Sequence, residues 1–158
     1  RNNTTIKNEF YMKTLEQLRP LIIEWANNKE LIKLENAPKQ RLKLIEECGE
    51  LASAILKNNV DEQKDAIGDI FVVLVILSEQ LDSELNLELY GIKTINYLLY
   101  LNYILDYSKE KNNLYFSIQY LLHLSCALNQ DLTECANIAW NQIKDRTGRN
   151  INGTFIKD

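Results

Sequence analysis

One apolar segment limits the possible folds of this chain more than any other feature. Residues 67–77 are apolar or small on almost every side, and Asp69 is the only charged residue among them. A helix that is apolar all round has to be buried by its neighbours. We therefore expect a helix over about residues 61–79, capped by Asp61, at the centre of the fold.

The rest of the chain also favours helices. Only 5 Gly and 2 Pro occur in 158 residues, so signals that break a helix are few. Apolar residues recur at helical spacing in five further segments. These predict helices that begin at residue 14 or 20 and end near 27, and helices at about residues 38–56, 87–107, 114–128 and 132–147. The sequence predicts an all-α fold, a compact bundle of about five to six helices.

Several helix ends carry local signals. Pro38 suits the first position of a helix, and Pro20 is tolerated only near a helix start. Asp131, followed three residues later by Glu134, forms a capping-box pattern. We expect Gly148 to end the last helix.

Length and charge narrow the function classes. A chain of 158 residues has the size of one domain, so we expect a single domain over residues 1–158, frayed at 1–10 and with a short tail at 149–158. The net charge of −4 argues against a partner that is a nucleic acid polymer. A small anionic ligand remains compatible with it, because a bound metal supplies positive charge locally. The longest apolar stretch, residues 66–78, is too short to span a membrane.

A group of acidic residues stands out on the second and third predicted helices. Glu46, Glu47 and Glu50 lie within one turn, and Asp65 and Asp69 are one turn apart on the next helix. Like charges at these spacings repel each other. An ionised Asp69 in an apolar helix has to be paired with a cation or bound to a metal, or else it must become neutral.

Two glycines accompany these acids. We expect Gly49 and Gly68 to let the two helices approach closely, so that the acids form one pocket of oxygen ligands for a hard cation such as Mg²⁺. Other interpretations exist, because neighbouring glutamates usually form a solvated face and a single buried Asp is often a structural hydrogen-bonding residue. Glu46 alone suits the solvated face, whereas Glu47, Glu50 and Asp69 together favour the metal site.

These motifs resemble the MazG-like, all-α nucleoside triphosphate pyrophosphohydrolase superfamily, which includes the dimeric dUTPases. The family carries E-x-x-E on one helix and E-x-x-D on the next. The first motif is matched by Glu47-Cys48-Gly49-Glu50. The second is matched by Ala66-Ile67-Gly68-Asp69, with Ala66 in place of the usual Glu and Asp65 one residue earlier.

The likeness extends to both ends of the chain. Trp25 looks like the family's tryptophan on the first helix, and residues 139–148 and 152–155 resemble the closing region of phage-type members. The resemblance implies a cytoplasmic protein of a bacterial or phage-infected cell.

The resemblance also implies an activity. Mg²⁺, with Mn²⁺ as a substitute, would be held by Glu47, Glu50 and Asp69 and by Asp65. The metal would bind the triphosphate and activate a water molecule, with Glu46 or Glu47 as the general base. The products would be a nucleoside monophosphate and pyrophosphate, from an NTP or a dNTP.

Basic residues near the end of the chain are candidates for binding phosphate. Lys144 and Arg146 lie in a segment with a surplus of positive charge, and Asn141 precedes Lys144 by one helical turn. Cations are also favoured at the C-terminus of any helix, which is an equally good explanation. Lys43 either binds phosphate or only screens Glu47, and Trp25 either stacks on a nucleobase or packs in the core.

Two further questions stay open at this stage. A catalytically weak nucleotide-binding module for regulation or interaction is the alternative function; Ala66 favours it, and the retained acids oppose it. Tyr97, Tyr100, Tyr103 and Tyr107 form a stripe that favours the core or a subunit interface over a platform for stacking bases. Since the apolar surface around this stripe exceeds what one small bundle needs, we expect a homodimer or homotetramer assembled through helix pairing between subunits.

Overall fold

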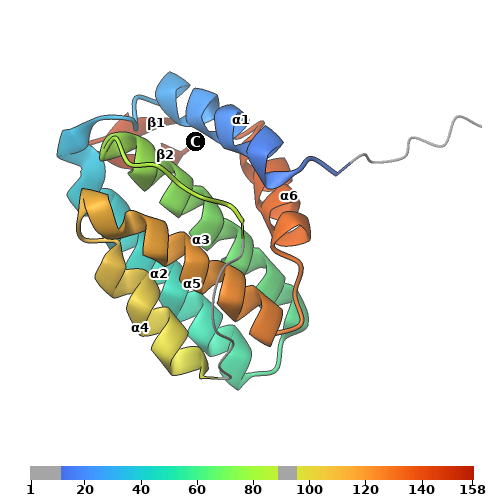
Figure 1. Ribbon diagram of the computed structural model, residues 1–158. Coiled ribbons are helices and arrows are strands. Elements are labelled where there is room, and N and C mark those ends of the chain that lie inside the picture. Colours follow the sequence, from blue (N-terminus) through green and yellow to red (C-terminus); the bar gives the residue numbers. More distant parts are fainter. Residues whose placement is uncertain (1–11, 89–95) are drawn as a thin grey trace, which may run out of the picture.

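The computed structural model describes residues 12–88 and 96–158. In this part of the chain the fold is all-α, as the sequence predicts, with one small hairpin near the C-terminus (Figure 1). The long helices are α1 (Leu15–Asn28), α2 (Ala37–Leu56), α3 (Val60–Gln80), α4 (Tyr97–Tyr107), α5 (Leu114–Ala127) and α6 (Leu132–Ile143). Two short 3₁₀ helices cover Leu34–Asn36 and Lys111–Asn113, and the hairpin strands are β1 (Gly148–Ile151) and β2 (Thr154–Lys157). No helix in these two ranges has the length and apolarity that a bilayer crossing requires.

Helix α3 is the centre of the bundle, which confirms the prediction from its apolar sequence. Every residue from Ala66 to Ser78 is buried except Asp69. Helices α1, α2, α5 and α6 all pack against α3, and α4 packs mainly against α5 (Figure 1). Asp69 is therefore the one residue of this run that reaches the surface of the helix bundle.

The N-cap of α3 lies two residues earlier than predicted. Asn59, and not Asp61, caps the helix by accepting a hydrogen bond from the backbone amide of Glu62 at 3.3 Å. Asn58 adopts a positive φ of 51° after α2, so the turn between the helices is completed early. Asp61 lies instead in the first turn of α3, where a negative charge is also favourable.

Helix α4 begins ten residues later than predicted. Residues 87 and 88 are not helical, residues 89–95 lie outside the described part, and Asn96 caps the helix through the Leu99 amide at 3.0 Å. Gln119 of α5 donates hydrogen bonds to the carbonyls of Asn86 and Glu88, at 2.9 and 2.8 Å. These tertiary contacts use backbone groups that a helix would need, and this accounts for the wrong start.

The end of the chain also departs from the prediction. Helix α6 stops at Ile143, and the expected tail is an antiparallel hairpin that pairs Gly148 with Lys157 and Ile151 with Thr154. Its turn uses Asn152 and Gly153, whose φ angles are 50° and 85°. Asn-Gly with two positive φ values is a strong hairpin signal, and sequence reasoning overlooked it because the segment is short and polar.

The two glycines do not face each other between α2 and α3, so that expectation is wrong. A Cβ atom on Gly68 would lie 2.2 Å from the Cys135 carbonyl oxygen and 2.9 Å from Cβ of Ala139. Gly68 therefore allows α6 to pack closely against α3. A Cβ atom on Gly49 would meet nothing within 4 Å. Helix α2 meets the core through larger side chains such as Leu44 and Leu51.

The tyrosine stripe of α4 packs within the subunit. Tyr103 and Tyr107 lie 4.6 and 5.6 Å from Tyr120 of α5, measured between ring centroids, and Tyr100 stacks on His123 at 6.0 Å. Tyr100 is buried in the core, whereas Tyr97, Tyr103 and Tyr107 are half-buried, so their part in a subunit interface stays a prediction.

The two glycines provide a matched pair for a stability test. Gly68→Ala should lower the free energy of unfolding by about 1–3 kcal/mol, because the new methyl group overlaps α6. Gly49→Ala should raise it by about 0.5–1 kcal/mol, because alanine favours the helix and the site has room. Urea denaturation followed by circular dichroism measures both. Equal effects of the two substitutions would contradict the close approach of α6 to α3.

Candidate active site

The five predicted acidic residues line one pocket. Its volume is about 520 Å³, and its walls come from α1, α2, α3, the end of α6 and the hairpin. The acids that line it are Glu46, Glu47 and Glu50 of α2 with Asp65 and Asp69 of α3. The structure therefore brings together, from two consecutive helices, every acid that the sequence singled out.

Glu47 is the most buried of these acids. The residue is 2% exposed, and Oε1 of Glu47 lies 2.6 Å from Nζ of Lys43. Oε2 is buried and has no hydrogen-bond partner among the described residues. Burial raises the pKa of Glu47 to about 7, and the negative charges of Asp69 and Glu50 add to the rise, although the contact with Lys43 opposes it.

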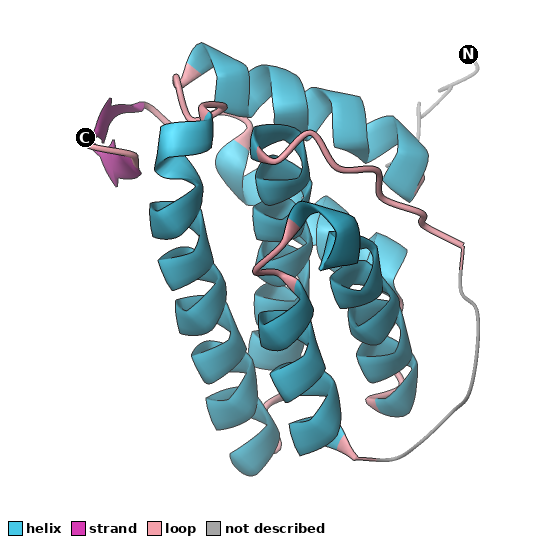
Figure 2. Ribbon diagram, turned by 60° about the vertical axis from the view of Figure 1, so that its left-hand side comes forward, coloured by secondary structure: helices cyan, strands magenta, loops and turns pink. Residues whose placement is uncertain are grey.

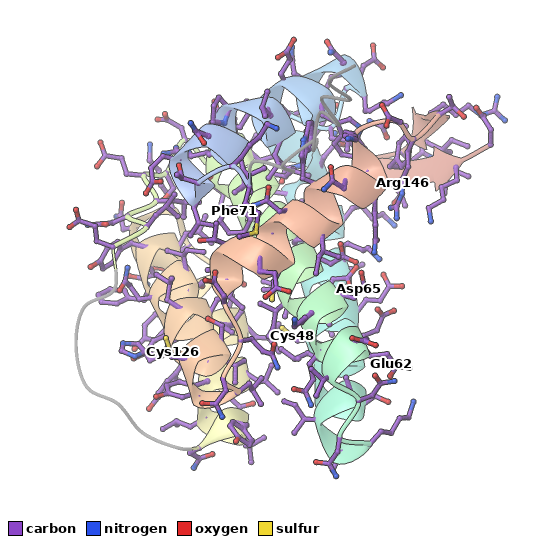
Figure 3. All side chains as sticks on the ribbon, turned by 90° about the vertical axis from the view of Figure 1, so that its right-hand side faces the viewer. Cys48, Glu62, Asp65, Phe71, Cys126 and Arg146 are labelled. Carbon is purple, nitrogen blue, oxygen red and sulfur yellow. The ribbon has the colours of Figure 1, made fainter. Side chains whose placement is uncertain are left out.

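Asp69 is partly buried and opens onto the pocket. Its burial and the neighbouring charge of Asp65 raise its pKa to about 6, against the opposing positive charge of Arg146. Asp65 accepts a hydrogen bond from Nε2 of Gln142 at 2.5 Å. Figure 3 shows Asp65 and Arg146 on the same side of the molecule, from α3 and from the chain just after α6.

The remaining acids are more exposed. Glu46 pairs with Lys43 at 2.8 Å and leaves more than half of its side chain in solvent, and Glu50 is also exposed. Ala66, which stands at the usual position of a family glutamate, is buried and does not line the pocket. Asp65 is the acid that faces the pocket from that turn of α3.

The acids do not form a closed coordination shell. In residues 12–88 and 96–158, no three Asp, Glu, His or Cys side chains are close enough together to hold a metal ion. The ammonium of Lys43 lies instead between Glu46 and Glu47. The residues nevertheless fit a hard cation, because all donors are carboxylate oxygens and one buried oxygen of Glu47 lacks a partner.

The predicted phosphate-binding residues divide into two groups. Arg146 and Lys43 line the pocket, whereas Lys144 and Asn141 are exposed and do not. Because α6 ends at Ile143, the chain turns before Arg146, and Gln142 takes the place facing Asp65.

Sequence reasoning missed two pocket cations. Lys39 and Lys157 both line the pocket. Lys39 lies one helical turn before Lys43, so the i, i+4 spacing was a usable signal. Lys157 comes into the pocket only because the tail folds as a hairpin.

Two aromatic side chains line the pocket beyond the acids. Trp25 and Phe155 meet edge to face, with ring centroids 5.4 Å apart and planes at 66°. The indole Nε1 of Trp25 is buried and has no hydrogen-bond partner among the residues the structure describes. The sequence singled out Trp25, while Phe155 appeared only within the likeness of the closing segment.

A second, larger hollow lies elsewhere. Its volume is about 1050 Å³, and it lies between α1, residues 82–88 and the start of α5. None of the predicted site residues lines it, and it borders the segment that is not described. The smaller pocket, which holds Glu47 and Asp69 with their raised pKa values, is therefore the candidate active site.

The fold and the pocket define a helical protein with a carboxylate-lined site between its second and third helices. Residues 37–92 match the family model of the MazG nucleotide pyrophosphohydrolase domain. The match confirms the predicted resemblance to the MazG-like superfamily, and it covers α2 and α3 with all five acids. At the level of the family, this supports a hydrolase of nucleotides.

A phage protein shows a similar likeness. The chain is 48% identical over 69 residues to an uncharacterized 18.2 kDa protein from the rep–hol intergenic region of Haemophilus phage HP1 (strain HP1c1). The aligned part is 44% of this chain and 42% of that protein, so the chain spans less than half the length of the curated relative it matches. No solved structure matches the chain.

The raised pKa of Glu47 predicts how stability depends on pH. Folding favours its protonated form, so its contribution to stability is complete below the ordinary value of 4.5 and is lost as the pH rises to about 7. In the presence of EDTA, Glu47→Gln should be more stable than the native protein above pH 7, and the difference should disappear toward pH 4.5. Thermal unfolding over this range measures it, with Glu46→Gln as the exposed control. A difference that grows as the pH falls would have the wrong sign.

Proposed function

We propose that this protein is a Mg²⁺-dependent nucleoside triphosphate pyrophosphohydrolase, which converts an NTP or dNTP to the monophosphate and pyrophosphate. The observation that carries the proposal is Glu47, a buried carboxylate with an unpartnered oxygen in a pocket shared with four other acids. The family match over α2 and α3 supports the same assignment.

The metal would be held by Glu47, Glu50, Asp65 and Asp69, with Mn²⁺ able to replace Mg²⁺. When bound, a divalent cation of this kind neutralises phosphate charge and lowers the pKa of a water molecule. A cation at these acids would also satisfy the buried oxygen of Glu47 and relieve the repulsion that raises the pKa of Asp69.

The protein's own residues would supply the proton transfer. A general base works best when its pKa is near the working pH. Glu47, whose pKa is about 7 without a bound cation, meets this condition only where it does not itself bind the metal, because a metal-bound carboxylate stays ionised. Glu46 is the second candidate; it lies beside Glu47 on the exposed side of the pocket and shares the contact with Lys43.

The basic residues of the pocket would bind the triphosphate. Arg146 lies close enough to Asp69 to oppose the rise in the pKa of that carboxylate, so its guanidinium is near the acids. Lys39 and Lys157 line the same pocket. Lys43 now pairs with Glu46 and Glu47, and a cation on these carboxylates would free its ammonium for a phosphate oxygen.

The alternative is a catalytically weak nucleotide-binding module with a regulatory or interaction role. Two observations favour it: Ala66 is buried away from the pocket, and the described acids do not form a closed metal shell. The products formed from each NTP and dNTP with Mg²⁺ distinguish the two functions. The proposed enzyme releases pyrophosphate and monophosphate in equal amounts and stops with EDTA. Release of single phosphate, or no product, would reject it.

The setting that we propose is the cytoplasm of a bacterial or phage-infected cell.

Substitutions separate metal ligands from structural acids. Asp69→Asn and Glu50→Gln keep the shape of each side chain and remove its charge, so turnover should fall by at least about a hundredfold with the fold intact. Glu62→Gln, an exposed acid at the start of α3 that does not line the pocket (Figure 3), should retain full activity. Circular dichroism verifies the fold. An active Glu50→Gln together with an unfolded Asp69→Asn would mean that the acids are structural.

We also propose that the protein assembles as a homodimer or homotetramer, through the exposed apolar face of α2. Leu42, Ile45 and Leu56 of α2 are 59%, 54% and 85% exposed. With Gly49 and Ala52 they follow the alternating three- and four-residue spacing of a coiled-coil seam. Gly49, which faces open space, lies in the middle of this seam.

Light scattering tests this assembly. The native protein should have at least twice the chain mass of 18.4 kDa, and Leu42→Lys with Ile45→Lys should shift it to the monomer. Leu34→Lys, which alters an exposed apolar residue outside α2, should not. A native mass of 18.4 kDa at micromolar concentration would refute the proposal.

A further inference from the structure

The pocket changes its chemistry along α3. Asp65 and Asp69 line one part of it, and Val72, Val73 and Ile76 line the next turns. The distance from Asp69 to Ile76 along the helix is about 10 Å. The pocket is therefore charged over one stretch and apolar over the following one, and a ligand that spans both has an anionic end and an apolar end.

The apolar end is closed by segments far apart in the sequence. Trp25 comes from the end of α1 and Phe155 from β2, and both lie outside the family match at residues 37–92. Their edge-to-face contact at 5.4 Å makes one aromatic wall. Figure 2 shows the hairpin at the end of the bundle where α1 crosses it.

Asparagine side chains hold the hairpin in this place. Nδ2 of Asn150 donates to the carbonyl of Glu30 at 2.7 Å, and Oδ1 of Asn150 accepts from the amide of Gly153 at 2.8 Å. The buried Asn36 donates to the carbonyls of Glu30 and Leu31, both at 3.2 Å. We call Asn36, Asn150 and Gly153 the asparagine clasp.

Gly153 completes the clasp because no side chain fits there. Its φ is 85°, and a Cβ atom would lie 2.7 Å from Oδ1 of Asn36. The hairpin can therefore approach the connector between α1 and α2 closely enough for Phe155 to reach Trp25. The clasp acts on the pocket through Phe155 and does not itself present a flat surface to a ligand.

Trp25 and Phe155 offer ring surfaces to a planar ligand. Both line the apolar part of the pocket, so a planar aromatic group can stack against this wall. A nucleobase is such a group, and its triphosphate would extend toward the acids.

We propose that Trp25 and Phe155 form a nucleobase subsite and that the asparagine clasp is the positioning device that keeps it assembled. The proposal rests on the proposed function and deepens it. It locates the choice of base in α1 and the C-terminal hairpin, outside the helices that carry the acids.

Fluorescence separates this subsite from catalysis. The chain has 2 Trp, so Trp140→Phe leaves Trp25 as the only indole, and Trp140 does not line the pocket. The probes are α,β-methylene analogues of nucleoside triphosphates with four different bases, and inorganic tripolyphosphate, which has no base. The nucleotide analogues should change the emission of Trp25 in the presence of Mg²⁺, and tripolyphosphate should change it little.

Substitutions on the hairpin test the role of Phe155. Phe155→Ala should weaken binding of the preferred nucleotide analogue about tenfold or more and leave tripolyphosphate binding within about twofold. Phe155→Leu removes the ring but keeps an apolar side chain of similar size. It should show the same loss of nucleotide binding, and it replaces Phe155→Ala in the test if the hairpin of the alanine variant does not fold. Ile156→Ala, on the exposed side of the same strand, is the matched control and should change neither.

The clasp has its own readout. Asn150→Ala should raise the KM for the nucleotide about tenfold with kcat nearly unchanged, because the base is held less well while the acids are untouched. A matching rise in the KM for tripolyphosphate would show a general structural defect and would overturn the positioning role.

Equal binding of native and Phe155→Ala protein to every analogue, or no binding of any analogue, would overturn the subsite. Absence of pyrophosphate release alongside base-dependent emission changes would instead refute only the proposed hydrolysis.

Discussion

The contact between Gly68 of α3 and the Cys135 carbonyl of α6 determines the position of everything that follows α6. A single Cβ atom at residue 68 would lie 2.2 Å from that oxygen, so α6 can occupy its place only against glycine. From this contact the chain continues through Gln142, which bonds Asp65, to Arg146 beside Asp69. One wall of the pocket is thus a consequence of how closely two helices pack.

The pocket concentrates negative charge that the bare protein neutralises only in part. Burial and mutual repulsion raise the pKa values of Glu47 and Asp69 to about 7 and about 6, and Lys43 relieves two of the five acids. Such an arrangement costs stability, because an ionised carboxylate is poorly solvated inside the protein. A ligand that binds only the folded state would raise the free energy of unfolding and offset this cost. The proposed cation would therefore stabilise the folded protein by neutralising the carboxylates that repel each other in the pocket.

The site divides its tasks between two parts of the chain. Helices α2 and α3, which lie in the segment that matches the MazG family, carry the acids. The end of α1 and the hairpin carry the aromatic wall, and Arg146 and Lys157 add two of the four basic side chains of the pocket. The family likeness therefore concerns the chemistry of the acids, and the surroundings of a bound base depend on segments outside the match.

Local patterns in the sequence were enough to predict the all-α class, the central position of α3 and the acids that share one pocket. Helical periodicity and burial act over one or two turns, and a lone Asp69 in an apolar helix is visible at that range. The Asn152-Gly153 turn was visible as well and was overlooked. Other features depend on docking between distant segments, which no local rule reports. The meeting of Trp25 with Phe155, the inclusion of Arg146 but not Lys144, and the late start of α4 all follow from side-chain contacts across the bundle. These were decided by the tertiary structure alone, because a helix pattern states which residues share a face but not what that face will meet.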